Sequence, residues 1–265
     1  MAKRILFGLL LAAIALSLFF VPPLVRYGMI TIFMMIAHQE MINAVQSAGY
    51  HPVVWPGYVF AVGVFPVYIL MDSNAVWVLL LLVTMGAFIQ RIFSKKITSQ
   101  DVFAGLVSFL YPLSFFMFLV FTASMSDRIW TTVLLSGIVT ACMTDTFALF
   151  SGMAFGKHPL APQISPKKTI EGAVGGFLFA IVSGVLLYHL QSLWQADYHI
   201  LRYIGAAMLG SVAGQIGDLV ASSIKREADI KDFSHLIPGH GGLLDRLDSI
   251  LFAIPMAYTF FVLTI

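Results

Sequence analysis

Charged residues are scarce in this 265-residue chain, at 11% of the sequence, whereas ordinary soluble domains carry about 25%. The net charge is only +2, from 15 Lys and Arg against 13 Asp and Glu, which excludes a polyanion-binding stripe and hence a nucleic-acid-binding protein. The single cysteine, Cys142, lies inside an apolar run, so a disulfide framework is also excluded. Hydrophobic residues make up 59% of the chain. Most of the surface must therefore face lipid, and the composition predicts a membrane protein.

Apolar runs of about 20 residues, the length that crosses a hydrocarbon core of about 30 Å, recur along the whole chain. We expect an all-α polytopic membrane protein with about nine transmembrane helices, at 5–20, 29–45, 53–71, 75–93, 102–122, 129–150, 172–190, 200–223 and 244–265. The first follows Lys3 and Arg4 and lacks a small-x-small cleavage site, so we expect it to be retained as a helix. The second contains His38, Gln39 and Glu40. It is the weakest span, and eight spans with a re-entrant or interfacial segment is the alternative.

The positions of Lys and Arg predict the orientation, because cytoplasmic loops carry an excess of both. With nine spans and the N-terminus inside, twelve lie on the inner side: Lys3, Arg4, Arg91, Lys95, Lys96, Lys157, Lys167, Lys168, Lys225, Arg226, Lys231 and Arg246. Three lie on the outer side: Arg26, Arg128 and Arg202. We therefore expect a multi-pass protein of the inner, cytoplasmic membrane, with the loops 153–171 and 224–245 on the cytoplasmic face.

Four carboxylates interrupt the apolar helices next to these two loops: Asp145, Asp218, Asp245 and Asp248. A lipid-facing Asp near a helix centre costs about 2.5 to 3.5 kcal/mol, so these side chains should face a polar cavity. The alternative is structural, with Asp245 capping a helix and pairing with Arg246. The chain then divides into N-terminal helices (1–100), middle helices with a cytoplasmic loop (101–171), and C-terminal helices expected to contain the active site (172–265).

Helical spacing places several of these polar groups on common faces. Asp218, Ser222 and Lys225 are spaced i, i+4 and i+7, and Asp245 and Asp248 are spaced i, i+3, so each set lies on one helix face. Three carboxylates at the inner end of a bundle form an oxygen-only site of the kind that Mg²⁺ prefers. The spacing neither requires nor excludes a second, monovalent cation.

Two glycine- and lysine-containing segments accompany the acidic residues. The turn Pro-Gly-His-Gly-Gly (238–242) precedes the last helix, where backbone amides bind phosphate in many proteins. The segment Ile-Ser-Pro-Lys-Lys-Thr-Ile-Glu-Gly (164–172) places Lys167 and Lys168 before a helix that Ser165 or Thr169 could cap. Acidic, basic, glycine and hydroxyl groups together indicate phosphoryl chemistry. Separately, a stripe of small residues in the eighth span predicts close helix packing: Ala206, Gly210, Gly214 and Gly217.

Residues 222–248 resemble the signature of the phosphatidate cytidylyltransferase (CDP-diacylglycerol synthase) family. That pattern contains Ser, one residue, an aliphatic and Lys-Arg, then four residues and Lys-Asp, then Pro-x-His-Gly-Gly and Asp-Arg-x-Asp, and this segment matches it throughout. The segment 164–172 is similar to the family's Ser-Pro-Lys-Lys-Thr stretch, with Ile170 where an aromatic residue is frequent. We expect the resemblance to extend over the whole chain, although residues 1–100 contain little that is diagnostic.

The resemblance implies a transferase that converts CTP and phosphatidate to CDP-diacylglycerol and diphosphate, with Mg²⁺ as cofactor and a homodimer as the assembly. Under this interpretation the expected metal ligands are Asp218, Asp245 and Asp248, with Asp145 as a further candidate. The expected catalytic residues are Asp218, Asp245, Asp248, Lys225, Arg226, Lys231, Asp232 and His240. The expected substrate-binding residues are Lys167, Lys168, Ser165, Ser222, Ser223, Gly241, Gly242 and Arg246.

Two other functions fit parts of the pattern. A CTP-dependent polyprenol or phytol kinase would also use a nucleoside triphosphate and a lipid, but the complete signature disfavours it. An ion-coupled secondary transporter would place its polar residues near the membrane midplane and show repeat symmetry, whereas here the polar residues gather at one face. Diphosphate release from CTP and phosphatidate separates the three functions.

Overall fold

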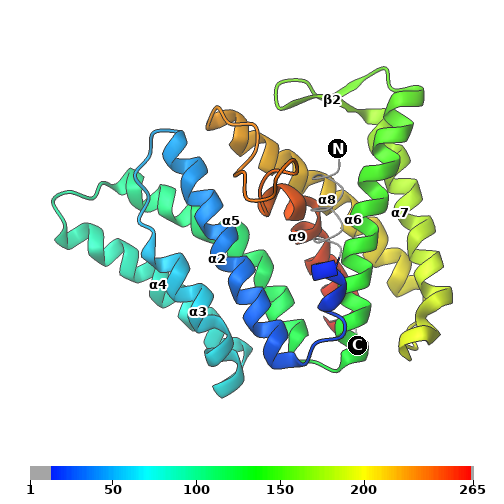
Figure 1. The fold of residues 1–265 in the computed structure, drawn as a ribbon, viewed down its shortest axis with the longest axis horizontal. Helices are drawn as coiled ribbons and strands as arrows, with labels where there is room; N and C mark the ends of the chain where they lie inside the picture. Colours follow the sequence, from blue (N-terminus) through cyan, green and yellow to red (C-terminus); the bar gives the residue numbers. More distant parts are fainter. Residues whose placement is uncertain (1–12, 264–265) are drawn as a thin grey trace. The chain divides into compact units, whose positions relative to one another are not determined.

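The structure is a computed structural model that describes residues 13–263, and it is mainly helical (Figure 1). The long helices are α2 (Pro23–Ser47), α3 (Trp55–Leu70), α4 (Ser73–Phe93), α5 (Ser99–Ala123), α6 (Asp127–Phe155), α7 (Ile170–Leu190), α8 (Ile200–Glu227) and α9 (Leu244–Tyr258). A 3₁₀ turn, η1 (Gln191–Trp194), follows α7, and a π-helical turn, η2 (Thr259–Leu263), follows α9. The strands β1 (Pro159–Ala161) and β2 (Ser165–Thr169) form an antiparallel hairpin. The sequence predicted only a loop there.

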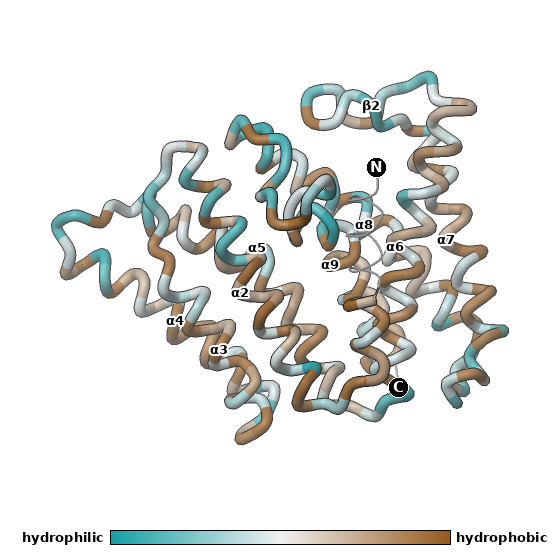
Figure 2. Tube along the Cα trace, in the orientation of Figure 1, coloured by the Kyte–Doolittle hydropathy of each residue, from teal (hydrophilic) through white to brown (hydrophobic). Residues whose placement is uncertain are grey.

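Within the described residues, six helical segments are long and apolar enough to cross a bilayer: Ser73–Phe93, Ser99–Ala123, Asp127–Phe155, Ile170–Trp194, Ile200–Glu227 and Leu244–Leu263. They correspond to the fourth to ninth spans expected from the sequence. This is therefore a helical, multi-pass membrane protein. Hydrophobic residues dominate these helices, whereas hydrophilic residues gather in the loop that precedes α9 (Figure 2).

The first three expected spans have different outcomes. The first half of the span at 5–20, residues 5–12, lies outside the described residues, and residues 13–17 are helical. The third corresponds to α3, which is apolar but has only 16 residues. The second, which contained the three polar residues, corresponds to α2, a helix of 25 residues that is not among the six apolar segments. The count of nine spans therefore stays a prediction.

The contacts divide the chain into two compact units. Unit 1 comprises Met1–Ser124 and Ile224–Asp245, and unit 2 comprises Met125–Ser223 and Arg246–Ile265. The sequence analysis divided the chain differently, into 1–100, 101–171 and 172–265, according to the expected helices and active site. That division stays a prediction.

In unit 1, α2 packs mainly on α5, and α3 packs mainly on α4. The buried His38 of α2 links these layers: its Nδ1 lies 2.8 Å from the carbonyl oxygen of Ser108, and its Nε2 lies 3.0 Å from that of Val54. Gly57 makes room for this ring, since a Cβ there would lie 2.3 Å from it. The polar residue that weakened the second span in the sequence is thus a satisfied core histidine.

In unit 2, α6 and α7 pack closely, because glycines on α7 let the backbones approach. A Cβ added to Gly176 would lie 2.6 Å from the carbonyl oxygen of Thr144. The predicted small-residue stripe of α8 packs in the same way: Gly214 meets the backbone of Ser249, and a Cβ at Gly217 would lie 2.5 Å from the carbonyl oxygen of Asp248. The expectation of close packing along this stripe is confirmed.

Side-chain caps define where several helices begin. Asp72 accepts a hydrogen bond from the amide of Ala75 at the start of α4, and Thr98 and Asp101 form a capping box on α5. Thr169 accepts from the amide of Gly172 at 3.1 Å and so begins α7. Such caps satisfy amides that have no partner inside the helix. Of the two capping candidates before α7, Thr169 is the cap, and Ser165 instead begins β2.

Candidate functional site

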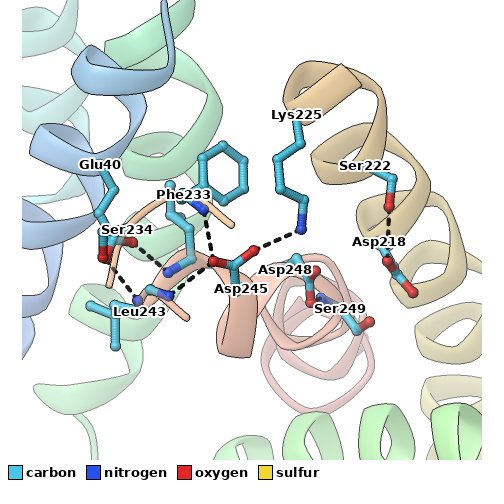
Figure 3. A network of polar contacts seen from close by, with 12 residues as sticks. Glu40, Asp218, Ser222, Lys225, Phe233, Ser234, Leu243, Asp245, Asp248 and Ser249 are labelled. Carbon is cyan, nitrogen blue, oxygen red and sulfur yellow. Dashed lines mark hydrogen bonds and ion pairs between the residues drawn. The ribbon is translucent and has the colours of Figure 1, made fainter. Parts of the chain in front are cut away.

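In unit 1, the carboxylate of Asp245 organises the loop that enters α9. Its Oδ1 accepts from Nζ of Lys225 at 2.7 Å, and its Oδ2 accepts from the backbone amides of Phe233 at 2.8 Å and Gly242 at 2.9 Å (Figure 3). The side chain is only 2% exposed. A buried carboxylate needs such partners, and here a lysine from the end of α8 supplies the positive charge.

A second buried carboxylate, Glu40 of α2, binds the same loop. Its Oε1 accepts from Oγ of Ser234 at 2.6 Å and from the amide of Leu243 at 2.8 Å, and its Oε2 accepts from the amide of Leu244 at 2.7 Å (Figure 3). The residue is 3% exposed. Sequence reasoning did not include Glu40 in the site. The only signal in the sequence is an acidic residue inside an otherwise apolar stretch.

The glycines of the turn before α9 have steric reasons for being glycine. Gly241 has φ +81°, a backbone conformation that L side chains rarely adopt. A Cβ on Gly242 would lie 2.6 Å from Oε1 of Glu40. The amide of Gly242 donates to Asp245, so in this conformation it is already used within the protein rather than offered to a phosphate.

The other predicted residues of the signature loop lie around this core. Arg226 and Lys231 are exposed, and Asp232 is half-buried. His240 is also half-buried, and its Nδ1 is a buried atom with no hydrogen-bond partner among the described residues. This segment thus combines an interior bound by two buried carboxylates with basic side chains that reach solvent.

In unit 2, a second lysine–aspartate pair joins the β-hairpin to α8. Nζ of Lys168, on β2, donates to Oδ2 of Asp218, and Oγ of Ser222 donates to Oδ1 of the same carboxylate at 3.4 Å. The side chains of both ionic partners are about a quarter exposed, at 29% and 26%. Asp145 of α6 interacts electrostatically with Asp218 and with Lys168. The structure thus brings together three residues that the sequence assigned to the site from three separate segments.

Asp248 lies near Asp218 through the packing of α9 on α8, because its backbone contacts Gly217, the residue that precedes Asp218. Oδ1 of Asp248 accepts from the amide of Ser249 at 2.8 Å. The remaining substrate-binding candidates were not used in any of these contacts. Ser165 is half-buried, and Lys167, Ser223 and Arg246 are exposed.

Glu171 shapes the hairpin that carries Lys167 and Lys168. Its carboxylate accepts from the amides of Lys157 at 3.1 Å and His158 at 3.2 Å, and its Oε1 lies 2.6 Å from Nδ1 of His158. These bonds join the two ends of the hairpin segment at the start of α7. Glu171 therefore fixes the base of the loop on which the two lysines stand.

The donor chemistry of unit 2 suits a small, hard cation. Among residues 13–263, no group of three or more His, Cys, Asp or Glu side chains lies close enough together to hold a metal ion. Mg²⁺ does not need such a group, because it usually keeps several waters and binds through one or two carboxylates together with substrate phosphates. Asp218, with Asp145 and Asp248 nearby, fits that requirement.

An apolar groove of about 340 Å³ opens in unit 2 between β1, α7 and α8. Its lining is apolar except for one residue: Leu160, Ile170, Ala173, Val174, Phe177, Val212, Gln215, Ile216 and Leu219. The amide group of Gln215 is turned to the protein, where Nε2 donates to the carbonyl oxygen of Ala173 at 3.3 Å. Two lining residues are close in sequence to the ion pair, since Leu219 directly follows Asp218 and Ile170 lies two residues after Lys168.

Fold and site together define a polytopic helical membrane protein in which each of two compact units contains a lysine–aspartate pair, and unit 2 also contains an apolar groove. The chain belongs to the cytidylyltransferase family, whose model matches residues 2–264. It is thus a member of a family of nucleotidyltransferases.

Three relatives illustrate the similarity. The phosphatidate cytidylyltransferase of Staphylococcus aureus (strain COL) is 33% identical over 259 residues, which cover 93% of this chain and 95% of the relative. That of Bacillus subtilis (strain 168) is 42% identical over 132 residues, and the match spans 50% of this chain and 48% of the relative. That of Haemophilus influenzae is 41% identical over 134 residues, or 49% of this chain and 46% of the relative. The resemblance inferred from residues 222–248 is confirmed.

Proposed function

We propose that this protein is a phosphatidate cytidylyltransferase, which forms CDP-diacylglycerol and diphosphate from CTP and phosphatidate for phospholipid biosynthesis. One observation carries the proposal: relatives with this printed function match almost the whole chain, at 33% identity over 259 residues. The unbroken signature at 222–248 supports the same reaction.

The reaction needs little covalent participation from the protein. A phosphate oxygen of phosphatidate attacks the α-phosphorus of CTP, a new P–O bond forms, and the bond from the α-phosphorus to the bridging oxygen breaks to release diphosphate. The attacking phosphate is ionised near neutral pH, so no strong general base is required. The protein's task is then to position two anions and to neutralise charge in the transition state.

Lysines supply part of that neutralisation. Lys225 and Lys168 each hold an aspartate, Asp245 and Asp218 respectively. When a substrate phosphate binds, an ammonium can exchange its carboxylate partner for a phosphate oxygen and so stay paired with an anion. We assign phosphate binding to Lys225 and Lys168, with the exposed cations Arg226, Lys231 and Lys167 as further contacts.

Mg²⁺ is the proposed cofactor, and Asp218 is its proposed principal ligand, with Asp248 and Asp145 beside it in unit 2. A bound Mg²⁺ stabilises charge on phosphate oxygens and on the leaving diphosphate. Asp245 remains a proposed ligand through Oδ1, which Lys225 would release, whereas Oδ2 stays bonded to the loop. Ser222 donates to Asp218 and so helps to orient it.

The apolar groove is the proposed site for an acyl chain of phosphatidate. Apart from Gln215 it is lined by apolar side chains, most of them on the membrane-spanning helices α7 and α8. Its residue Ile170 lies two positions after Lys168, a cation that can attract the lipid phosphate. We further propose that the site faces the cytoplasm from the inner membrane, consistent with the excess of Lys and Arg in the loops 153–171 and 224–245. A homodimer remains the proposed assembly.

The test uses the purified protein in lipid vesicles with CTP and Mg²⁺. With phosphatidate added, we expect stoichiometric diphosphate and CDP-diacylglycerol. With a polyprenol in place of phosphatidate, we expect no phosphorylated product. Phosphorylation of the polyprenol with release of CDP would replace this proposal by the kinase, and the absence of any CTP consumption would reject both enzymes.

A further inference from the structure

Glu40 is a buried acid that lies outside the signature at 222–248. It accepts a hydrogen bond from the backbone amide of Leu243, 203 residues further along the chain. It lies on α2, in the part of the chain that shows no motif. Three donors converge on it, namely the hydroxyl of Ser234 and the amides of Leu243 and Leu244. Leu244 is the first residue of α9, so Glu40 acts as a capping carboxylate supplied by another helix.

Capping from a distant helix has an electrostatic basis. The first amides of a helix lack partners inside the helix and carry partial positive charge, which favours an anion at that end. Glu40 is 3% exposed, and it makes charge-assisted hydrogen bonds at 2.6 to 2.8 Å. A buried carboxylate would be unfavourable without such partners.

Glu40 and Asp245 hold consecutive amides of the same turn. Asp245 takes the amide of Gly242, and Glu40 takes those of Leu243 and Leu244. The absence of a side chain at Gly242 is required by this arrangement, since a Cβ would lie 2.6 Å from Glu40 Oε1. Displacing Glu40 would therefore free the backbone that immediately precedes Asp245.

We propose that Glu40 is a positioning residue for the cytidylyl-transfer site. It holds the turn 238–242 and the start of α9, and through them the Asp245–Lys225 pair, in the geometry that receives the CTP phosphates. This role rests on the proposed function, because it assumes that Lys225 binds a phosphate of CTP.

The test compares Glu40→Gln with the control Asp101→Asn. Asp101 is a half-buried residue whose carboxylate caps α5 in the same unit, so its amide variant also weakens a helix cap. For Glu40→Gln we expect the KM for CTP to rise about tenfold or more, since misplacing a positioning contact can cost about 100-fold. Hydrogen exchange at the amides of Leu243 and Leu244 should accelerate about tenfold, as expected for loss of a charge-assisted hydrogen bond. Asp101→Asn should leave both quantities at the wild-type value.

The two readouts separate positioning from stability. Loss of folded protein alone would lower the apparent kcat and leave the KM for CTP unchanged. A folded Glu40→Gln variant with wild-type KM and wild-type exchange at Leu243 and Leu244 would overturn the proposal. If the wild-type protein itself shows no CTP turnover, the proposed function fails, whereas the exchange measurement still shows whether Glu40 holds the turn.

A double-mutant cycle covers the case in which Glu40→Gln folds poorly. Gly242→Ala adds the Cβ that meets the Glu40 carboxylate, and Glu40→Ala removes that carboxylate. We expect Gly242→Ala to lower the thermal midpoint more in the wild type than in the Glu40→Ala background, because contacting residues are coupled. Equal effects in both backgrounds would contradict the contact on which the proposal depends.

Discussion

The ammonium group of Lys225 lies 2.7 Å from Oδ1 of Asp245, and the aspartate side chain is 2% exposed. Lys168 and Asp218 form a similar pair in unit 2. In both pairs, a lysine expected to bind phosphate holds an aspartate expected to bind Mg²⁺. Each pair keeps both of its charges compensated within its own unit.

Replacing Asp218 by Asn should abolish turnover. The amide keeps the size of the side chain but removes the negative charge that pairs with Lys168 and would bind Mg²⁺, so we expect kcat to fall by about 100-fold or more, the range found when a charge-stabilising group is lost. Diphosphate release in vesicles measures the effect. Glu227→Gln, an exposed acid at the end of the same helix, is the matched control and should keep wild-type activity. Full activity in Asp218→Asn would remove Asp218 from the proposed metal ligands.

Removal of Mg²⁺ should stop the reaction reversibly. Chelation with EDTA is expected to abolish diphosphate release, and added Mg²⁺ is expected to restore it, because the proposed carboxylates need the substrate phosphates to complete the coordination. Asp248→Asn should raise the Mg²⁺ concentration that gives half-maximal rate. Turnover that persists in EDTA would contradict a magnesium-dependent mechanism.

Replacing Lys225 by Met should destabilise the protein as well as inactivate it. The change leaves the buried Asp245 carboxylate without its cation, and breaking a buried pair from one side costs about 3 to 5 kcal/mol. The double variant Lys225→Met/Asp245→Asn should recover part of that loss, since it removes the uncompensated charge. Thermal unfolding, followed by intrinsic tryptophan fluorescence, measures the stability of the single and the double variant. If Lys225→Met is as stable as the wild type, the Lys225–Asp245 pair contributes little to the free energy of unfolding.

A bulky residue in the apolar groove should affect the lipid substrate selectively. Val212→Trp adds an indole to the groove lining and is expected to raise the KM for phosphatidate several-fold while the KM for CTP stays unchanged. Val182→Trp is the control, because Val182 is an exposed valine of α7 outside the groove. If both variants have the same KM for phosphatidate, the groove does not bind the acyl chain.

Loss of the Glu171 carboxylate should loosen the hairpin. Glu171→Gln cannot accept bonds from Lys157, His158 and the His158 ring in the same way, so trypsin should cleave faster after Lys167 and Lys168. The fragment pattern on a gel or by mass spectrometry follows the change. Asp197→Asn, outside the hairpin, should leave the cleavage rate unaltered, and unchanged cleavage in Glu171→Gln would show that other contacts hold the loop.

Much of the helical order was predictable because it depends on local properties of the chain. Hydropathy over about 20 residues locates spans, and six of the expected ones coincide with apolar helices long enough to cross a bilayer. The spacing of Gly210, Gly214 and Gly217 likewise predicted a packing surface. By contrast, the β-hairpin over 159–169 escaped prediction, because its strands have only three and five residues and show no clear alternation.

The candidate site was predictable where its residues are close in sequence. Asp218, Ser222 and Lys225 lie on one helix, and the signature turn is continuous, so periodicity and resemblance identified them. Glu40 could not be found in this way. An acid in an apolar stretch can face a cavity, cap a helix or bind an ion, and the sequence contains no local feature that selects among these roles.

The sequence by itself determined that this is a multi-pass helical membrane protein with a cytidylyltransferase signature, because scarce charge, long apolar runs and a dense motif are properties of the chain alone. Only the tertiary structure decided the partners of the charges. Lys168 meets Asp218 across 50 residues, and Glu40 meets the start of α9 across more than 200. A buried charge is stable only beside groups that compensate it, and packing, rather than sequence spacing, brings those groups within hydrogen-bonding distance.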